Sequence, residues 1–349
     1  MLPAPSLLDS TIDRRLWGMR DLAPLFPHLT AQDPPIAEIW LTGASSRFAS
    51  GPLAGRELGD AWRLMPAEWK GALCLNDTAV PILAKFIFAG EKLSIQVHPG
   101  DAYAAEHEPA RGGRGKTEMW HVLAARPGSE LFLNLLPGVT PDSFRRAIDD
   151  ASLESLIARV PVSPGDSLFV PPGTVHTIGG GIMLCEIMEQ SDITYRVYDY
   201  KRKGPDGRER PLHVRQALEV INFGEQLGEK IRPVRHTSRG LLTHYLAACR
   251  YFAAERWEFS APVAAVTQPA SFELLVVLSG SGQLEHAGQP QPYAPTQAWF
   301  LPASLGAFQL HPSEPTVLLH TFVPDLDAYC RRLSALGIPS DDWSRILHL

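Results

Sequence analysis

Short hydrophobic runs, separated by proline and glycine, occur along most of the chain. Runs of this length that contain many β-branched and aromatic residues and end at turn-forming residues are typical of β-strands. The 31 prolines and 28 glycines strengthen this pattern, so we predict a mainly β protein. The expected strands are Ile36 to Leu41, Ala84 to Phe88, Leu93 to Val97, Met119 to Leu123, Leu131 to Leu135, Ser167 to Val170 and Ile182 to Ile187.

One segment with helical spacing interrupts the strands. Thr140 is a suitable N-cap, and the first helical position that follows it is a proline. Apolar residues then recur at helical intervals over Pro141 to Val160, and Asp149 to Ser152 should divide the segment into two short helices. Further helices are predicted over Val214 to Ile221 and from Asp325 onward.

The second half of the chain is again strand-like, from about His244 to Val323. A length of 349 residues suggests about two domains. The polar segment from Gly224 to Arg239 is the expected linker between them. We predict a first β-barrel in residues 1–235, with a helical insertion near 140–160, and a second barrel with a helical tail in residues 236–349.

Composition narrows the functional class. The formal net charge of -6 and the pI of about 6.1 argue against a nucleic-acid binder. No apolar stretch is long enough to span a membrane, and the first residues do not resemble a signal peptide, so a cytoplasmic protein is expected. A disulfide framework or a thiolate metal site is not expected from the four scattered cysteines: Cys74, Cys185, Cys249 and Cys330.

Two segments place histidines where they could bind a metal ion. The sequence GDSLFVPPGTVH ends on His176 after a rigid Pro-x-Gly turn, which should direct the imidazole into the barrel. In LSIQVH, Gln96 and His98 are two residues apart, so strand periodicity places both side chains on one face. Each segment taken alone is also compatible with a structural histidine.

A third segment, GKTEMWH, supplies the carboxylate Glu118 at the predicted start of a strand. Taken alone, Glu118 is equally compatible with an ion pair to Lys116 or with a surface position. Combined with the two histidines, it gives a mixed nitrogen and oxygen ligand set. Such a set suits zinc, iron, manganese, cobalt or nickel, and a catalytic site would leave one position open.

A fourth segment, QSDITYRVYDY, contains Asp192 and Arg196. Arginine binds phosphate through two parallel hydrogen bonds and places a fixed positive charge near a developing oxyanion. The alternative is an Asp192–Arg196 ion pair at the barrel rim.

These four segments, in their order along the chain, resemble the type I phosphomannose isomerases of the cupin superfamily. The similarity extends from about Leu16 to Phe223 and includes the opening segments LLDSTIDRRLWG and IAEIWLTG. It implies two cupin (jelly-roll) barrels and one Zn²⁺ per chain, bound by Gln96, His98, Glu118 and His176.

The resemblance also implies roles for the remaining polar residues. Arg196 is implied as a catalytic residue, with Asp192 either positioning it or transferring a proton. Ser94 and Lys116 are implied to hold the substrate, particularly its phosphate, and Lys85 is assigned to the same region. The second barrel has no histidine pair at the metal positions, since His311 and His320 lie outside them, and it is expected to be structural.

The expected reaction is the interconversion of mannose 6-phosphate and fructose 6-phosphate through an enediol or enediolate. The sequence leaves the general base open among a zinc-bound water, Asp192, Glu186 and His98. It also leaves two rival functions, another metal-dependent cupin enzyme and a non-catalytic sugar-phosphate-binding cupin. A small sugar phosphate is the expected partner, without nucleic acid or membrane, and a monomer and a dimer are both compatible.

Overall fold

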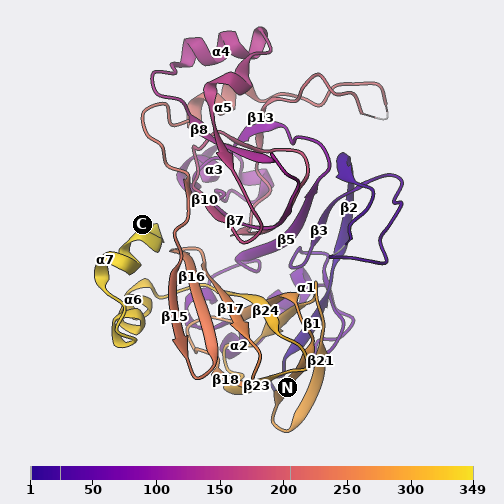
Figure 1. Cartoon of the computed structure of the whole chain (residues 1–349), viewed down its shortest axis with the longest axis vertical. Coiled ribbons are helices and arrows are strands. Elements are labelled where there is room, and N and C mark those ends of the chain that lie inside the picture. Colours follow the sequence, from indigo (N-terminus) through magenta and orange to yellow (C-terminus); the bar gives the residue numbers. More distant parts are fainter. Residues whose placement is uncertain (1, 24, 205, 349) are drawn as a thin grey trace.

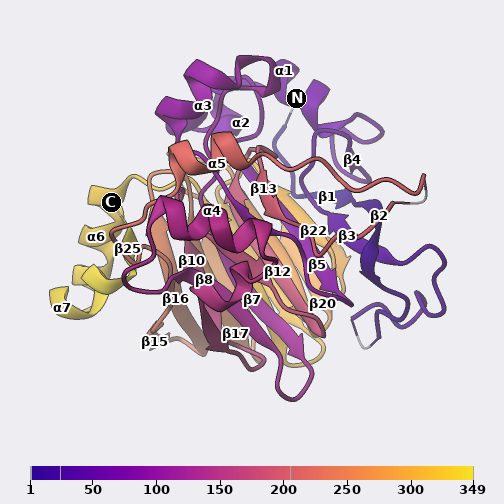
Figure 2. The ribbon, with the colours of Figure 1, turned by 90° about the horizontal axis from the view of Figure 1, so that it is seen from above.

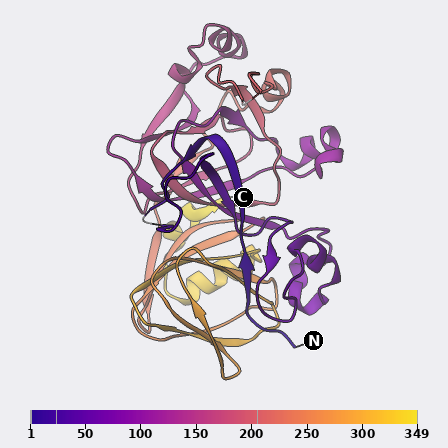
Figure 3. The same cartoon turned by 90° about the vertical axis from the view of Figure 1, so that its right-hand side faces the viewer.

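The computed structural model describes residues 2–23, 25–204 and 206–348. It contains two β-sandwiches stacked one on the other (Figures 1 and 3), which confirms the predicted mainly β, jelly-roll fold. The pairing between neighbouring strands of each sheet is antiparallel, apart from one short parallel pair at the chain end. The functional residues predicted from sequence all lie in the first sandwich.

The first sandwich joins a seven-stranded sheet to a five-stranded sheet. All seven strands predicted from sequence lie here, with ends shifted by no more than two residues. The seven-stranded sheet contains, in spatial order, β14 (Glu229–Lys230), β10 (Ser167–Val170), β7 (Glu118–Ala125), β12 (Ile182–Glu189), β5 (Ile82–Ala89), β3 (Ile36–Trp40) and β2 (Thr11–Met19). The five-stranded sheet contains β13 (Tyr195–Tyr198), β6 (Ile95–Val97), β11 (His176–Ile178), β8 (Glu130–Leu135) and β9 (Ile157–Pro161).

The second sandwich joins a nine-stranded sheet to a four-stranded sheet. The larger sheet contains β15 (Val234–Ser238), β16 (Leu241–Cys249), β17 (Ala253–Phe259), β24 (Thr316–Phe322), β19 (Glu273–Ser279), β22 (Ala298–Leu301), β1 (Ser6–Asp9) and β4 (Arg47–Phe48), with β25 (Leu347–His348) beside β16. The smaller sheet contains β18 (Val263–Val266), β23 (Ala307–Pro312), β20 (Gly282–His286) and β21 (Gln289–Tyr293).

Strand pairing links the chain ends across the predicted domains. β1 and β4, from the start of the chain, pair in the sheet that otherwise comes from the second half. The predicted linker is not free coil, because β14 closes the edge of the first sheet and β15 begins the second. The boundary near residue 235 stays a prediction. The pairings show that the second sandwich includes two strands, β1 and β4, from the N-terminal segment.

The two sandwiches share a hydrophobic core between their large sheets. In β5, all eight residues are buried, because one face of the strand lines the first sandwich and the other packs towards the second. Phe86 and Phe88 belong to the core that also contains Leu274 and Phe300 of the second sandwich, whereas Ile87 faces the first sandwich. Burial on both faces explains why the β5 sequence, apart from Lys85, is apolar without alternation.

The helices agree with the predictions at Thr140 and in the tail, and they differ after Leu156 and at the chain end. The Thr140 hydroxyl accepts a hydrogen bond from the Ser143 amide at 3.2 Å, which confirms the predicted N-cap. The second predicted helix there is wrong beyond Leu156, because β-branched residues from Ile157 pair with β8 as β9. The helical tail is confirmed (Figure 2), but the chain then returns as β25 beside β16.

The helix at residues 214–220 is confirmed to within one residue. None of the helices in the described residues is long and apolar enough to cross a membrane. The α-helices are α1 (Leu58–Leu64), α2 (Ala67–Lys70), α3 (Asp101–His107), α4 (Pro141–Asp149), α5 (Val214–Val220), α6 (Leu326–Ala335) and α7 (Ser340–Trp343). Short 3₁₀ turns occur at η1 (Ala72–Cys74), η2 (Pro109–Arg111), η3 (Leu153–Leu156) and η4 (Ser344–Ile346).

Candidate functional site

Three predicted ligands meet inside the first sandwich. His98 follows β6, Glu118 opens β7 and His176 opens β11, so two sheets contribute to one point. One ligating atom from each of the three side chains lies within 4.8 Å of the others, and all three residues are buried. The strand pairing explains the meeting, because His176 lies directly opposite Gln96 in the antiparallel pair of β11 and β6.

Backbone carbonyls orient both imidazole rings. Nδ1 of His98 lies 2.8 Å from the Ile193 carbonyl, and Nδ1 of His176 lies 2.9 Å from the Thr174 carbonyl. A carbonyl can only accept, so Nδ1 carries the proton in each ring and Nε2 presents a lone pair. Burial lowers the pKa of His176 to about 3, and the repulsion of its neighbour His98 adds to that effect, so the ring is neutral near pH 7.

Glu118 is the carboxylate of this cluster. Its Oε1 lies 3.2 Å from Nε2 of His98, and its Oε2 lies 3.7 Å from Nε2 of His176. Among the described residues neither oxygen accepts a well-formed hydrogen bond, although the Lys116 ammonium group contacts Oε1. Burial by itself would raise the pKa of Glu118, but Lys116 and the two histidines bring it well below its usual range. An ionised carboxylate beside two imidazole lone pairs is a donor set that fits a divalent cation.

Gln96 lies beside the cluster with its amide nitrogen 3.2 Å from Nε2 of His176. Its amide oxygen lies 3.5 Å from the Ser94 hydroxyl. Rotation of the amide group by half a turn exchanges these two atoms and presents the oxygen to the cluster. Gln96 is therefore within reach as a fourth ligand. In the present orientation its amide nitrogen points at Nε2 of the His176 ring.

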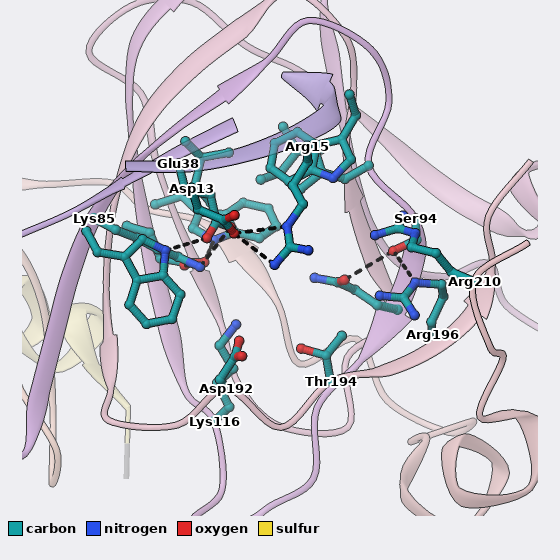
Figure 4. Close-up of a pocket in the computed structure, with 18 of the residues that line it drawn as sticks. Asp13, Arg15, Glu38, Lys85, Ser94, Lys116, Asp192, Thr194, Arg196 and Arg210 are labelled. Atoms are coloured by element: carbon teal, nitrogen blue, oxygen red, sulfur yellow. Dashed lines mark hydrogen bonds and ion pairs between the residues drawn. The ribbon is translucent and has the colours of Figure 1, made fainter. Parts of the chain in front are cut away.

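A cavity of about 330 Å³ adjoins the cluster, and Figure 4 shows residues that line it. It is lined mainly by charged and polar side chains, with Trp17, Trp40 and Trp120 as aromatic walls. Gln96 and Lys116 connect the cavity to the histidine cluster, since both line the cavity and contact the cluster. The polar lining includes Ser94, Lys85, Glu38, Glu186, Asp192, Arg196, Arg15 and Arg210.

A chain of buried and half-buried charges forms one side of this cavity. Lys85 lies 3.1 Å from Glu38 and 3.0 Å from Glu186, and the indole of Trp120 donates to Glu186 at 2.8 Å. Burial raises the pKa of Glu186, and repulsion from Glu118 adds to this shift. Burial alone would lower the pKa of Lys85, but its two carboxylate partners raise it overall. Sequence reasoning missed Glu38, and its only signal is a single carboxylate within the otherwise apolar strand IAEIW.

The other predicted residues also reach the cavity. Arg196 donates from Nε to the Ser94 hydroxyl at 3.3 Å and from Nη1 to the Pro211 carbonyl at 3.1 Å. Asp192 lines the cavity but is exposed, and its backbone carbonyl, rather than its carboxylate, accepts from Arg111 at 2.9 Å. Within the described residues no ion pair joins Asp192 to Arg196, so the rim ion pair considered from sequence does not form.

Known proteins resemble this chain along most of its length. Residues 242–320 match the family model described as the mannose-6-phosphate isomerase cupin domain. The chain is 32% identical over 332 residues to the mannose-6-phosphate isomerase ManA of Bacillus subtilis, a match that covers 92% of this chain and 100% of that protein. It is 34% identical over 281 residues to a Streptococcus mutans mannose-6-phosphate isomerase, a match that covers 80% of this chain and 86% of that protein.

The fold comparison agrees with the sequence comparison. The crystal structure of the mannose 6-phosphate isomerase from Bacillus subtilis superimposes with a TM-score of 0.83 at 26% identity. The superposition covers 91% of this chain and 99% of that chain, so both sandwiches take part in it.

Proposed function

The chain belongs to the mannose-6-phosphate isomerase family, and we propose that it interconverts mannose 6-phosphate and fructose 6-phosphate with one zinc ion per chain. The observation that carries this proposal is the buried group His98, Glu118 and His176 beside a polar cavity. Gln96 is the proposed fourth ligand. A bound zinc ion would act as a Lewis acid on the sugar oxygens.

The cavity residues have separate tasks in this proposal. Isomerisation removes the proton at C2 of the open-chain aldose, forms an enediol or enediolate, and returns a proton at C1, while the hydroxyl proton passes from O2 to O1. Arg196 places a fixed positive charge near the developing negative charge. Ser94, Lys116 and Lys85 contact the substrate from the cavity wall.

Asp192 is the proposed proton carrier. Its carboxylate lines the cavity and is exposed, so it is free to approach a bound sugar. The other carboxylate considered, Glu186, is already engaged by Lys85 and Trp120. A general base must lie within hydrogen-bond reach of the proton that it removes, and the freer group meets this requirement more readily.

A coupled assay tests the reaction and the cofactor together. Fructose 6-phosphate formed from mannose 6-phosphate is measured in purified protein, after chelation, and after zinc is added back. We expect chelation to abolish turnover and zinc to restore it. No turnover in the zinc-loaded protein would contradict the isomerase proposal and favour a non-catalytic sugar-phosphate-binding cupin. Oxygen consumption or dependence on iron would favour a different cupin enzyme.

A further inference from the structure

We propose that Arg15 and Arg210 bind the phosphate group of the substrate, with the charge of Arg196 adding to the positive potential of the same cavity, an inference that rests on the proposed function. Figure 4 shows these residues in one cavity, with Arg15 between the Lys85 side and the Arg196–Arg210 side. Sequence reasoning did not single out Arg15 or Arg210, because neither belongs to a metal or catalytic motif.

The two sides of the cavity differ in how their charges are paired. Lys85 has two carboxylate partners, the buried Glu186 and the half-buried Glu38, and Lys116 has Glu118. These ammonium groups are thus already neutralised by carboxylates, and a phosphate would compete with those partners. The lysines therefore suit the sugar hydroxyls better than the phosphate.

The arginine side carries surplus positive charge. Arg210 and Arg202 share a single carboxylate, Asp199, with contacts of 2.6 Å and 2.5 Å. Arg196 forms no ion pair among the described residues, and its guanidinium group donates to two neutral oxygens, the Ser94 hydroxyl and the Pro211 carbonyl. Burial lowers the pKa of Arg196, and repulsion from Arg210 and Arg15 adds to this effect.

Arg15 adds to this surplus from a different part of the chain. Its guanidinium group lies 2.9 Å from Asp13, a partner that is itself partly exposed. Among the described residues, Arg15, Arg196, Arg202 and Arg210 have two carboxylate partners in total, Asp13 and Asp199, which leaves about two positive charges on this side of the cavity. A phosphate monoester carries a charge of about −1.5 to −2 near pH 7, so its negative charge matches the unpaired positive charge of these arginines.

The local backbone explains how Arg15 reaches the cavity. In β2, Arg14 and Met19 both pair with Ile36 of β3, so the residues between them leave the ladder as a bulge. Bulges re-aim side chains and are frequent next to active sites. Here the bulge carries Arg15 and Trp17, both of which line the cavity.

The test compares Arg15→Gln with Arg14→Gln, its neighbour outside this cavity with the same change in net charge. Hydrogen bonds to charged groups predict a rise in KM for mannose 6-phosphate of about tenfold to hundredfold for Arg15→Gln. The change in kcat should be much smaller, and Arg15→Lys should recover part of the loss. Affinity for inorganic phosphate, measured by calorimetry, should fall by a similar factor. Arg14→Gln should stay within about twofold of the wild type.

A KM and a phosphate affinity for Arg15→Gln within about twofold of the wild type would overturn the proposal. Asp13→Asn provides an independent variant, because it frees Arg15 from its carboxylate and should tighten phosphate binding; weaker binding would also contradict the proposal. Phosphate titration needs no turnover. An inactive wild type would therefore refute the isomerase proposal, whereas an active wild type with an unaffected Arg15→Gln would refute only the role of Arg15.

Discussion

Both sandwiches bury histidine beside glutamate, yet the two clusters are chemically opposite. In the first sandwich, backbone carbonyls occupy Nδ1 of His98 and His176, which leaves both Nε2 atoms facing Glu118. In the second, His320 contacts Glu255 through Nδ1 at 3.3 Å and Glu273 through Nε2 at 2.8 Å.

The partners of the imidazole therefore decide its charge. Burial would lower the pKa of His320, but Glu273 and Glu255 raise it to about 9, whereas the pKa of His176 falls to about 3. A protonated ring between two carboxylates has no lone pair for a metal ion. The second cluster also contacts Arg332 of α6 through Glu255, so it holds the C-terminal helix on the sheet. The difference indicates that a buried His–Glu group can offer an imidazole lone pair when a backbone carbonyl, rather than a second carboxylate, holds the other ring nitrogen.

The largest expected effect comes from His176→Gln, with His320→Gln as the matched variant in the second sandwich. Loss of a ligand should remove the metal ion and its stabilisation of several kcal/mol, so turnover should fall by about 10³-fold or more. Metal content per chain and turnover are measured together. At a temperature where it is folded, His320→Gln should keep its metal content and its turnover. A loss of metal in that variant would contradict the inference that only the first cluster binds metal.

Asp192→Asn comes next and tests the cavity rather than the cluster. Removing a general base should lower kcat by about 10²-fold or more, with little change in KM or metal content, because the amide cannot take a proton. Steady-state kinetics of this variant are compared with those of Glu186→Gln. A larger fall in kcat for a folded Glu186→Gln would assign the proton transfer to Glu186 instead.

His320→Gln should destabilise the fold by about 3 kcal/mol, because breaking a buried ion pair leaves charges without partners. Denaturant unfolding measures this difference, with the partly exposed His236→Gln as the control. A difference no larger than that of His236→Gln would show that the cluster does not hold the second sandwich together.

The same variant has a predictable pH dependence. His320 has a folded-state pKa above its unfolded value, so its contribution is complete below about pH 6.5 and is lost as the pH rises through about 9. Burial would raise the pKa of Glu255, but Arg332 and His320 lower it to about 2, so its contribution is complete above about pH 4.5 and is lost as the pH falls through about 2. The stability gap between wild type and His320→Gln should be greatest near pH 5 to 6.5 and shrink toward pH 9.

The smallest expected effect concerns α6, which Arg332 connects to the second cluster. The Asp325 carboxylate accepts from the Ala328 amide at 2.9 Å and caps this helix. Asp325→Ala should cost about 1 kcal/mol of unfolding free energy without changing turnover. A loss as large as that of His320→Gln would mean that the cap, rather than the buried ion pairs, holds the tail.

Much of the first sandwich was predictable because local spacing carries the information. The strand alternation around Gln96 and His98 and the Pro-x-Gly turn before His176 act over a few residues, and both predictions of placement inside the sandwich are confirmed. The start of α4 was predictable for the same reason, because the Thr140 cap acts over only three residues. Predictions that extended a local pattern too far were wrong, as at Ile157, where pairing with β8 replaced the helix.

The sequence by itself determined the mainly β fold, the positions of most strands in the first sandwich and the residue types available for chemistry. Only the tertiary structure decided which charges pair. Glu38, Lys85 and Glu186 come from three strands that are neighbours in the sheet but distant in the chain. Arg15 reaches the cavity through a bulge that depends on pairing with β3. The physical reason is that side-chain direction follows from local backbone geometry, whereas an ion pair depends on which distant strands become neighbours.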